Sequence, residues 1–198
     1  MEDFLKVLKT SAEIESDAIA KAFCKINEET FGAAVKLLCE SERIGSSGCG
    51  HSGIACMHFA HLMCCAERPA RFISPAEAVH GATGFLQSGD VMFFVSRGGQ
   101  TSELIPIADI CKRKGVKIVT VTENTESALA KVADVVLPIV ITRETDKYNS
   151  QGTTSFAVTN ALFDALQAAV IEATGYKNEQ FAVIHPGGAV GKRLNKNK

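Results

Sequence analysis

Short apolar runs alternate with helical patterns through the middle of this 198-residue chain, and that alternation constrains the fold more than any other feature. Runs of this length that are apolar on both faces and separated by helices are typical of a parallel sheet covered on each side. We therefore predict a doubly wound α/β domain. Strands are expected at 70–74, 91–96, 116–122 and 135–140, with a fifth, glycine-rich strand at 43–47 inferred from its position.

Helices are expected between and around these strands, and together they suggest one domain over 1–198. Gly115 suits a helix end, because glycine adopts the left-handed conformation without a steric penalty. We expect a helical arm over about 1–41, a sheet core over 42–141, and C-terminal helices with a turn-rich tail over 142–198. The individual helices are expected at 4–26, 31–41, 53–67, 103–114, 127–132, 153–175 and 178–184.

Composition argues against several classes of protein. The formal net charge of −1 gives no general attraction to nucleic acid or an anionic membrane. The N-terminus lacks the regions of a signal peptide, and no apolar run approaches the roughly 18 residues that a spanning helix needs. Seven cysteines at scattered spacings suit reduced thiols better than a disulfide framework. We expect a cytoplasmic protein without nucleic-acid or membrane partners.

One loop stands out at the edge where doubly wound sheets bind their ligands, beyond the carboxyl ends of the strands. Residues 91–103 run from apolar side chains into Ser-Arg-Gly-Gly-Gln-Thr-Ser-Glu before a predicted helix. Hydroxyls and open backbone amides at a helix N-terminus suit a bound phosphate. Glu103 adds a carboxylate in the first helical turn, which suggests chemistry on a phosphorylated small molecule. Taken alone, a simple helix cap by Thr101 or Ser102 explains the loop about as well.

A second loop, at 48–53, reads Gly-Cys-Gly-His-Ser-Gly and has the spacing of a dinucleotide-binding fingerprint. That interpretation requires an acidic residue about 20 positions further on, at the end of the second strand. The strand ends without one, and Glu77, beyond a proline, is poorly placed. A second anion- or hydroxyl-binding loop, with His51 and Ser52 facing the ligand, fits better. We therefore expect no nicotinamide cofactor.

Histidine and cysteine cluster on the helix expected after this loop. His58, His61 and Cys65 share one helical face, and imidazole and thiolate are the usual ligands of zinc. The helix is apolar on most sides, however, and the spacing does not give a closed set of four ligands. We expect buried packing or a subunit contact here, and no metal.

Two further histidines stand in turn-rich segments. His80 lies in the broken, polar segment 74–84, where a histidine could move protons at neutral pH, although a solvated loop histidine is an equal alternative. His185 lies in Ile-His-Pro-Gly-Gly-Ala-Val-Gly at 184–191, and this much turn chemistry suggests that the side chain is held against another group. Glu144, just after the last strand, is the remaining titratable residue at the predicted ligand-binding edge.

The chain resembles a sugar isomerase (SIS) domain, and specifically the arabinose-5-phosphate isomerase family, from about residue 4 to residue 194. Four motifs carry the resemblance in order: Gly-Cys-Gly-His-Ser-Gly, Ser-Pro-Ala-Glu-Ala-Val-His-Gly, Ser-Arg-Gly-Gly-Gln-Thr-Ser-Glu and His-Pro-Gly-Gly-Ala-Val-Gly. The resemblance implies a flavodoxin-like three-layer sandwich and a tetramer whose active sites draw on more than one subunit. It also implies interconversion of D-arabinose 5-phosphate and D-ribulose 5-phosphate, feeding Kdo synthesis for lipopolysaccharide or capsule.

The same resemblance implies roles for individual residues. His80, Glu103, Glu144 and His185 match acid–base positions of the family, where ring opening and proton transfer through an enediolate need groups that exchange protons near neutral pH. Glu144 and His185 are the leading proton-transfer pair, with His80 close behind as the base. Glu103 is expected to orient sugar hydroxyls or to set the protonation of the histidines. The substrate and its phosphate are expected to contact Ser47, His51, Ser52, Ser96, Arg97, Gly99, Gln100 and Thr101.

The chain departs from the family pattern in three places. His51 replaces the usual lysine, Ala82 replaces an aspartate, and Ser-Arg-Gly-Gly at 96–99 replaces Ser-Asn-Ser-Gly. Arg97 could offset the lost hydroxyl by binding phosphate through two N–H groups. Two alternatives stay open: a sugar-phosphate sensor without turnover, and an isomerase of the same type acting on a hexulose phosphate. Many family members carry a regulatory module after this domain, and the sequence ends before one.

Overall fold

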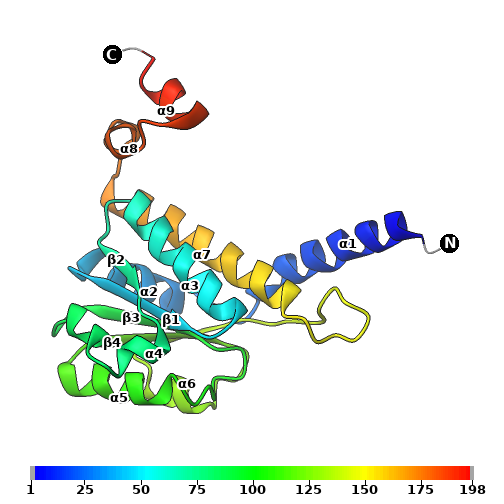
Figure 1. The fold of residues 1–198 in the computed structure, drawn as a ribbon, viewed down its shortest axis with the longest axis horizontal. Helices are drawn as coiled ribbons and strands as arrows, with labels where there is room; N and C mark the ends of the chain where they lie inside the picture. The colour runs from blue at the N-terminus through cyan, green and yellow to red at the C-terminus, as the bar shows by residue number, and fades with distance from the viewer. Residues whose placement is uncertain (1–2, 197–198) are drawn as a thin grey trace.

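The five predicted strands form one parallel sheet in the computed structural model, which describes residues 3–196 (Figure 1). Every neighbouring pair is parallel, and the order is β2-β1-β3-β4-β5. This is the strand order of the flavodoxin-like doubly wound fold, so the predicted fold class is confirmed. The strands are β1 (Ile44–Gly48), β2 (Ala70–Phe72), β3 (Val91–Val95), β4 (Lys117–Thr122) and β5 (Val135–Pro138).

Two strands are shorter than predicted by two residues. β2 ends at Phe72, because the chain turns at Ser74 into the short helix α4 (Pro75–Ala78). β5 ends at Pro138, because its neighbour in the sheet, β4, ends at the paired residue Thr122. The other strand bounds differ from the prediction by a single residue at one or both ends.

Helices cover both faces of the sheet, so the domain has three layers: helices, sheet and helices. Each face of the sheet has its own cluster of buried apolar side chains. β3 shows the division: Val91, Phe93 and Val95 pack into one cluster, and Met92 and Phe94 pack into the other. The first cluster includes α1 (Phe4–Ala22), α2 (Glu28–Glu40), α3 (His51–Cys65) and α7 (Thr153–Thr174), and the second includes α5 (Ile105–Lys114), α6 (Ala128–Val132) and the segment around the 3-10 helix η1 (Ala82–Phe85).

Helix ends differ from the prediction for local reasons. α1 stops at Ala22 rather than at residue 26, and α2 starts earlier than predicted, at Glu28. The Asn27 side chain explains the early start, because it accepts a hydrogen bond from the Thr30 amide and caps α2. Gly115 ends α5 in the left-handed conformation with φ of 71°, as predicted.

The C-terminal tail is more helical than the sequence suggested. α8 (Asn178–Ile184) lies where it was expected, but a further helix, α9 (Gly188–Leu194), replaces much of the expected glycine-rich turn. Gly191 permits this arrangement, because a Cβ at that position would lie 2.5 Å from the carbonyl carbon of Pro186. The predicted turn is therefore limited to the few residues between α8 and α9.

Helix α7 overturns the expectation that no apolar segment approaches the length of a spanning helix. By length and composition alone it is long and apolar enough to cross a membrane, with 22 residues and a mean hydropathy of 1.2 in its 18-residue window. Its apolar face packs into the core of the domain through Val158, Phe163, Leu166 and Val170. This packing accounts for the apolar composition of α7.

The glycine fingerprint at 48–53 has a structural explanation in the contact between β1 and α3. A Cβ on Gly53 would lie 2.7 Å from the Gly48 carbonyl oxygen, and a Cβ on Gly48 would lie 2.8 Å from the Ser52 carbonyl carbon. Both contacts are with backbone, which cannot swing aside. Glycine at both positions therefore lets α3 start directly against the end of β1.

We expect Gly53→Ala to lower the free energy of unfolding by about 1–3 kcal/mol, because overpacking must push α3 away from β1. Urea denaturation of the purified protein measures the change. Gly32→Ala is the matched control, because Gly32 is an exposed residue inside α2 with nothing within 4 Å of an added Cβ. The control should gain about 0.5–1 kcal/mol from helix propensity. Equal effects of the two substitutions would contradict the close approach of α3 to β1.

Candidate active site

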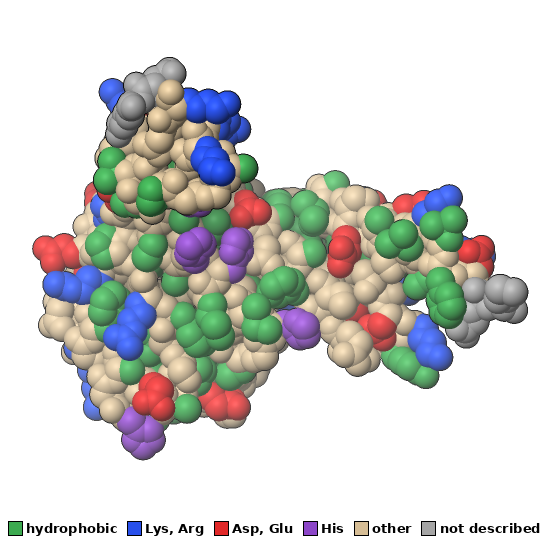
Figure 2. Space-filling view, turned by 45° about the horizontal axis from the view of Figure 1, so that its top comes forward, with side chains coloured by type: hydrophobic (Ala, Val, Ile, Leu, Met, Phe, Trp, Pro, Cys, Tyr) green, Lys and Arg blue, Asp and Glu red, His purple; other side chains and the backbone are tan. Residues whose placement is uncertain are grey.

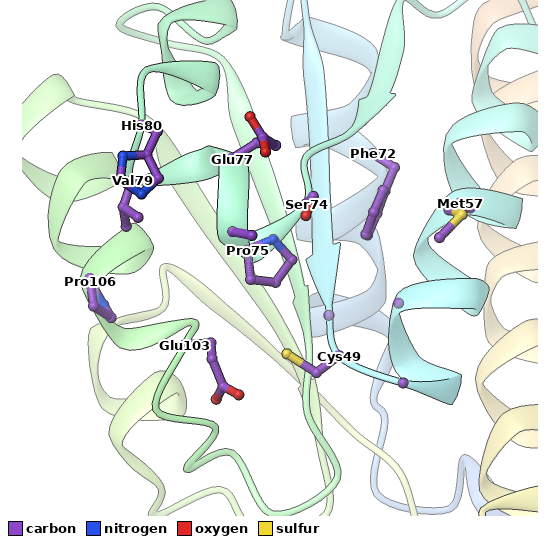
Figure 3. A pocket seen from close by; sticks show the side chains of 14 residues that line it. Cys49, Met57, Phe72, Ser74, Pro75, Glu77, Val79, His80, Glu103 and Pro106 are labelled. Carbon is purple, nitrogen blue, oxygen red and sulfur yellow. The ribbon is translucent and has the colours of Figure 1, made fainter.

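A pocket of about 910 Å³ opens at the carboxyl edge of the sheet, where the loops after β1, β2 and β3 meet (Figure 3). Met57 and Phe72 form an apolar side of this pocket. Among the described residues, no lysine or arginine lines it. Its titratable lining residues are Cys49, Glu77, His80 and Glu103. The structure thus brings two of the predicted acid–base residues, His80 and Glu103, to one pocket.

Glu103 lies in a turn before α5, so its predicted place in the first helical turn is wrong. The N-cap of α5 is Leu104, and neither Thr101 nor Ser102 caps the helix. The Ser102 hydroxyl donates to the Glu103 carboxylate at 2.9 Å. The Glu103 backbone amide and this hydroxyl lower the pKa of the carboxyl group. Burial and the nearby Glu103 charge raise the pKa of the Cys49 thiol (Figure 3).

The loop between β3 and α5 has the features of an anion site. Ser96 is almost fully buried, and its hydroxyl lies 2.8 Å from the Thr101 hydroxyl. Within residues 3–196, the backbone amides of Gly98, Gln100 and Thr101 donate to no protein carbonyl. Paired hydroxyls and open amides ahead of a helix can hold a phosphate.

Gly99 shapes this loop rather than contributing a free donor. Its amide donates to the Ser96 carbonyl at 3.0 Å, so the expectation of an open N–H group at this position is wrong. Its φ is 65°, and an added Cβ would lie 1.9 Å from Oγ of Ser127, the N-cap of α6. The Gly99 carbonyl accepts from the Leu129 amide at 3.2 Å. Glycine is therefore required for the loop to pack on α6.

Glu144, predicted as a proton-transfer residue, is completely buried in this structure. Its carboxylate accepts from Arg97 Nη1 at 2.7 Å, the Ser155 amide at 3.2 Å and Oγ1 of Thr153 at 3.3 Å. Arg97 also contacts Glu123 through Nε. Two carboxylates thus engage Nε and Nη1 of Arg97, which leaves Nη2 for the phosphate contact predicted there. To exchange a proton with a substrate, Glu144 would have to become accessible.

The residues predicted in the β1–α3 loop lie beside the start of α7. His51 is exposed and lies edge-on to Phe156, with ring centroids 5.9 Å apart. His51, Ser52 and Arg97 line a cavity of only about 20 Å³. The Ser47 hydroxyl is buried at the end of β1 and has no hydrogen-bond partner among the described residues. Their contacts with a substrate stay predictions.

His185 is not brought together with the other predicted site residues within one chain. It lies at the end of α8, which follows the C-terminal end of α7, away from the loops after β1, β2 and β3 (Figure 1). Gln180 of α8 donates a hydrogen bond of 3.1 Å to Glu67, just after α3, so α8 contacts that end of the molecule. The imidazole packs on the Phe181 ring with centroids 5.0 Å apart.

The pocket also contains residues that the sequence reasoning passed over. In the sequence Glu77 is only a poorly placed ribose ligand, and Cys49 is not among the predicted site residues. A signal was available for Glu77, which precedes His80 by one helical turn in the same motif. For Cys49 the only signal was its place between the glycines of the 48–53 loop.

The histidines of α3 are on the surface, so the expectation of buried packing is wrong for them. His58 Nε2 lies 3.6 Å from Asp164, and its side chain is 43% exposed. His61 Nε2 lies 3.6 Å from the Cys65 thiol. Among residues 3–196, no group of three such side chains converges as metal ligands would. A subunit contact at this face stays a prediction.

Comparison with known proteins agrees with the fold and the motifs. Residues 37–169 match the model of the SIS domain family. The arabinose 5-phosphate isomerase KdsD of Pseudomonas aeruginosa is 35% identical over 192 residues, which are 97% of this chain and 59% of the relative. The chain thus spans about three fifths of the length of this curated relative.

Solved structures match along nearly the full chain. A Listeria monocytogenes protein described as a "putative sugar-phosphate isomerase" is 36% identical with a TM-score of 0.89, covering 94% of this chain and 100% of its own. A Bacteroides fragilis protein described as a "putative phosphosugar isomerase involved in capsule formation" is 25% identical with a TM-score of 0.86, covering 93% of this chain and 98% of its own. Because the SIS family model matches residues 37–169, and the strand order agrees with the predicted fold, the chain belongs to the SIS domain family.

Proposed function

We propose that this chain is an aldose–ketose isomerase that interconverts D-ribulose 5-phosphate and D-arabinose 5-phosphate through an enediolate. One observation carries the proposal: the loop suited to phosphate lies at the same edge of the sheet as a pocket lined by Glu103 and His80. A relative named for this reaction matches 97% of the chain. We infer a role in supplying Kdo for lipopolysaccharide or capsule synthesis, carried out in the cytoplasm.

In the proposed mechanism, the phosphate anchors the substrate and the pocket residues move its protons. The hydroxyls of Ser52, Ser96 and Thr101, with the open amides of the loop at Gly98, Gln100 and Thr101, bind the phosphate. A phosphate in the loop takes the place of the contact between the Ser96 and Thr101 hydroxyls. Ring opening and transfer of a proton between C2 and C1 need an acid–base group at the reacting carbons. His80 and Glu103 both line the pocket, from the segments after β2 and β3, and can meet them there.

The proposed active site takes His185 from a second copy of the chain. Within one chain His185 lies at the far end of α7, so a second subunit can carry it to the pocket without any movement of α8 and α9. Exposed apolar side chains on α1 support assembly, because Phe4 is 72% exposed and Leu8 is 65% exposed. Figure 2 shows hydrophobic side chains along the arm that protrudes from the body of the domain. We propose a tetramer with shared active sites.

Turnover of D-ribulose 5-phosphate by the purified protein, without added metal or cofactor, tests the proposal. We expect formation of D-arabinose 5-phosphate, measured by chromatography or NMR, and a loss of about 100-fold or more in the Glu103→Gln variant. Binding of sugar phosphates without turnover would contradict the isomerase and favour a sensor. Turnover of a hexulose phosphate alone would contradict the proposed substrate.

A further inference from the structure

Glu144 is held by a set of donors that leaves its carboxylate no contact with solvent. It is 0% exposed, and Arg97 is the charged donor among its partners, at 2.7 Å. The remaining donors, Ser155 and Thr153, are neutral and lie at 3.2 and 3.3 Å. Burying a carboxylate without a countercharge is strongly destabilising. Arg97 is therefore what makes the buried position of Glu144 tolerable.

Arg97 joins three loops that follow three neighbouring strands. It sits in the loop after β3, and its guanidinium contacts Glu123 after β4 and Glu144 after β5. Its backbone carbonyl also accepts from the Glu123 amide at 3.0 Å and from the Thr122 hydroxyl at 3.0 Å. Glu123 in turn accepts from the Ile141 amide at 2.8 Å. This network fixes the chain where it leaves the sheet.

Glu144 connects the Arg97 network to the segment 142–155, which leads into α7, through hydrogen bonds at both ends of the segment. The Glu144 amide donates to Oδ1 of Asn149 at 2.6 Å, and the Ser155 amide donates to the Glu144 carboxylate. Near its end, the segment meets His51, because a Cβ on Gly152 would lie 3.3 Å from that ring. The end of the segment therefore forms one wall of the small cavity that His51 and Ser52 line.

We propose that Arg97 and Glu144 form a positioning pair that holds the segment 142–155 against the β1–α3 loop, and that Arg97 is not a phosphate ligand. The pair acts on the proposed isomerase reaction by placing His51 and the start of α7. The proposal rests on the proposed function for its kinetic readout. Phosphate binding is left to the hydroxyls and amides of residues 96–101, together with Ser52.

A double-mutant cycle of Arg97→Met and Glu144→Gln tests the pair. We expect each single variant to lower kcat by roughly 10- to 100-fold through misplacement of the site, with KM changed less than about threefold. The double variant should be no worse than the poorer single variant, because contacting residues are not additive. Arg97→Lys should recover part of kcat, since an ammonium can still contact one carboxylate. Arg113→Met is the control, because Arg113 forms an exposed ion pair with Asp109 on α5, away from the network of Arg97.

Two outcomes overturn the proposal. A rise of more than about tenfold in KM for Arg97→Met, with kcat kept, would assign Arg97 to the phosphate. A loss of kcat in the double variant equal to the product of the two single losses would show that Arg97 and Glu144 act independently. If the unmodified protein has no turnover, the proposed function fails. The positioning pair is then tested by stability alone, through the urea concentration at the midpoint of unfolding of each variant. Coupled losses of the midpoint in the cycle support the positioning pair, and additive losses reject it.

Discussion

Replacing Gly99 by alanine is expected to lower turnover of D-ribulose 5-phosphate by about 100-fold or more, because displacement of a positioned group by about 1 Å costs that much. The added Cβ would lie 1.9 Å from the Ser127 Oγ, and Gly99 has a φ of 65° that alanine adopts only with strain. Ser127 cannot easily move, because it is buried and caps α6. The loop carrying Ser96 and Thr101 must therefore shift. Strain and overpacking together should cost roughly 2–4 kcal/mol of unfolding free energy.

Gly98→Ala is the matched control for this prediction. Gly98 adjoins Gly99, but an added Cβ there meets nothing within 4 Å. The control should keep the free energy of unfolding within about 0.5 kcal/mol, as expected for an exposed site without packing contacts. Adding Ser127→Gly to Gly99→Ala should restore part of the stability, because it removes the clashing side chain. A stable and fully active Gly99→Ala protein would show that the packing of this loop on α6 does not control the site. Steady-state kinetics and urea denaturation measure both effects.

The sheet could be predicted from the sequence because its information is local. Each strand is a short apolar run, and a parallel sheet between two helical layers follows from runs that are apolar on both faces. The end of α5 at Gly115 could also be predicted, because the preference of a single glycine for the left-handed conformation determines where the helix stops. The start of α5 was not, because residues before Leu104 form a turn that shares the composition of a first helical turn.

The arrangement of the candidate site depended on contacts that no local pattern records. Glu144 was recognisable as a carboxylate after the last strand, but its burial depends on Arg97, 47 positions earlier in the chain. His185 was recognisable from its turn-rich motif, but its distance from the pocket depends on the length and direction of α7. In both cases the residue was identified and its surroundings were not. Contacts between subunits, such as the proposed delivery of His185, are even less accessible to prediction, because no pattern within one chain specifies them.

Shared active sites predict a gain of activity when two inactive variants are combined. Glu103→Gln and His185→Ala should each lose about 100-fold or more of the turnover, because each removes a proposed acid–base group. If every site takes Glu103 from one subunit and His185 from another, randomly mixed oligomers should regain about a quarter of the unmodified activity. Coexpression with two different affinity tags and purification on both tags isolates the mixed oligomers, whose kcat is then measured.

The second combination, Glu103→Gln with His80→Gln, separates sharing from a general effect of mixing. Glu103 and His80 line the same pocket of one chain, so each mixed site is expected to have both residues from one subunit. About half of the sites would then lack Glu103 and half would lack His80, and activity should not return. Recovery in both combinations would mean that His80 also crosses between subunits. Recovery in neither would contradict the delivery of His185 by a second copy, and the positions of α8 and α9 would then have to change within one chain for His185 to reach the pocket.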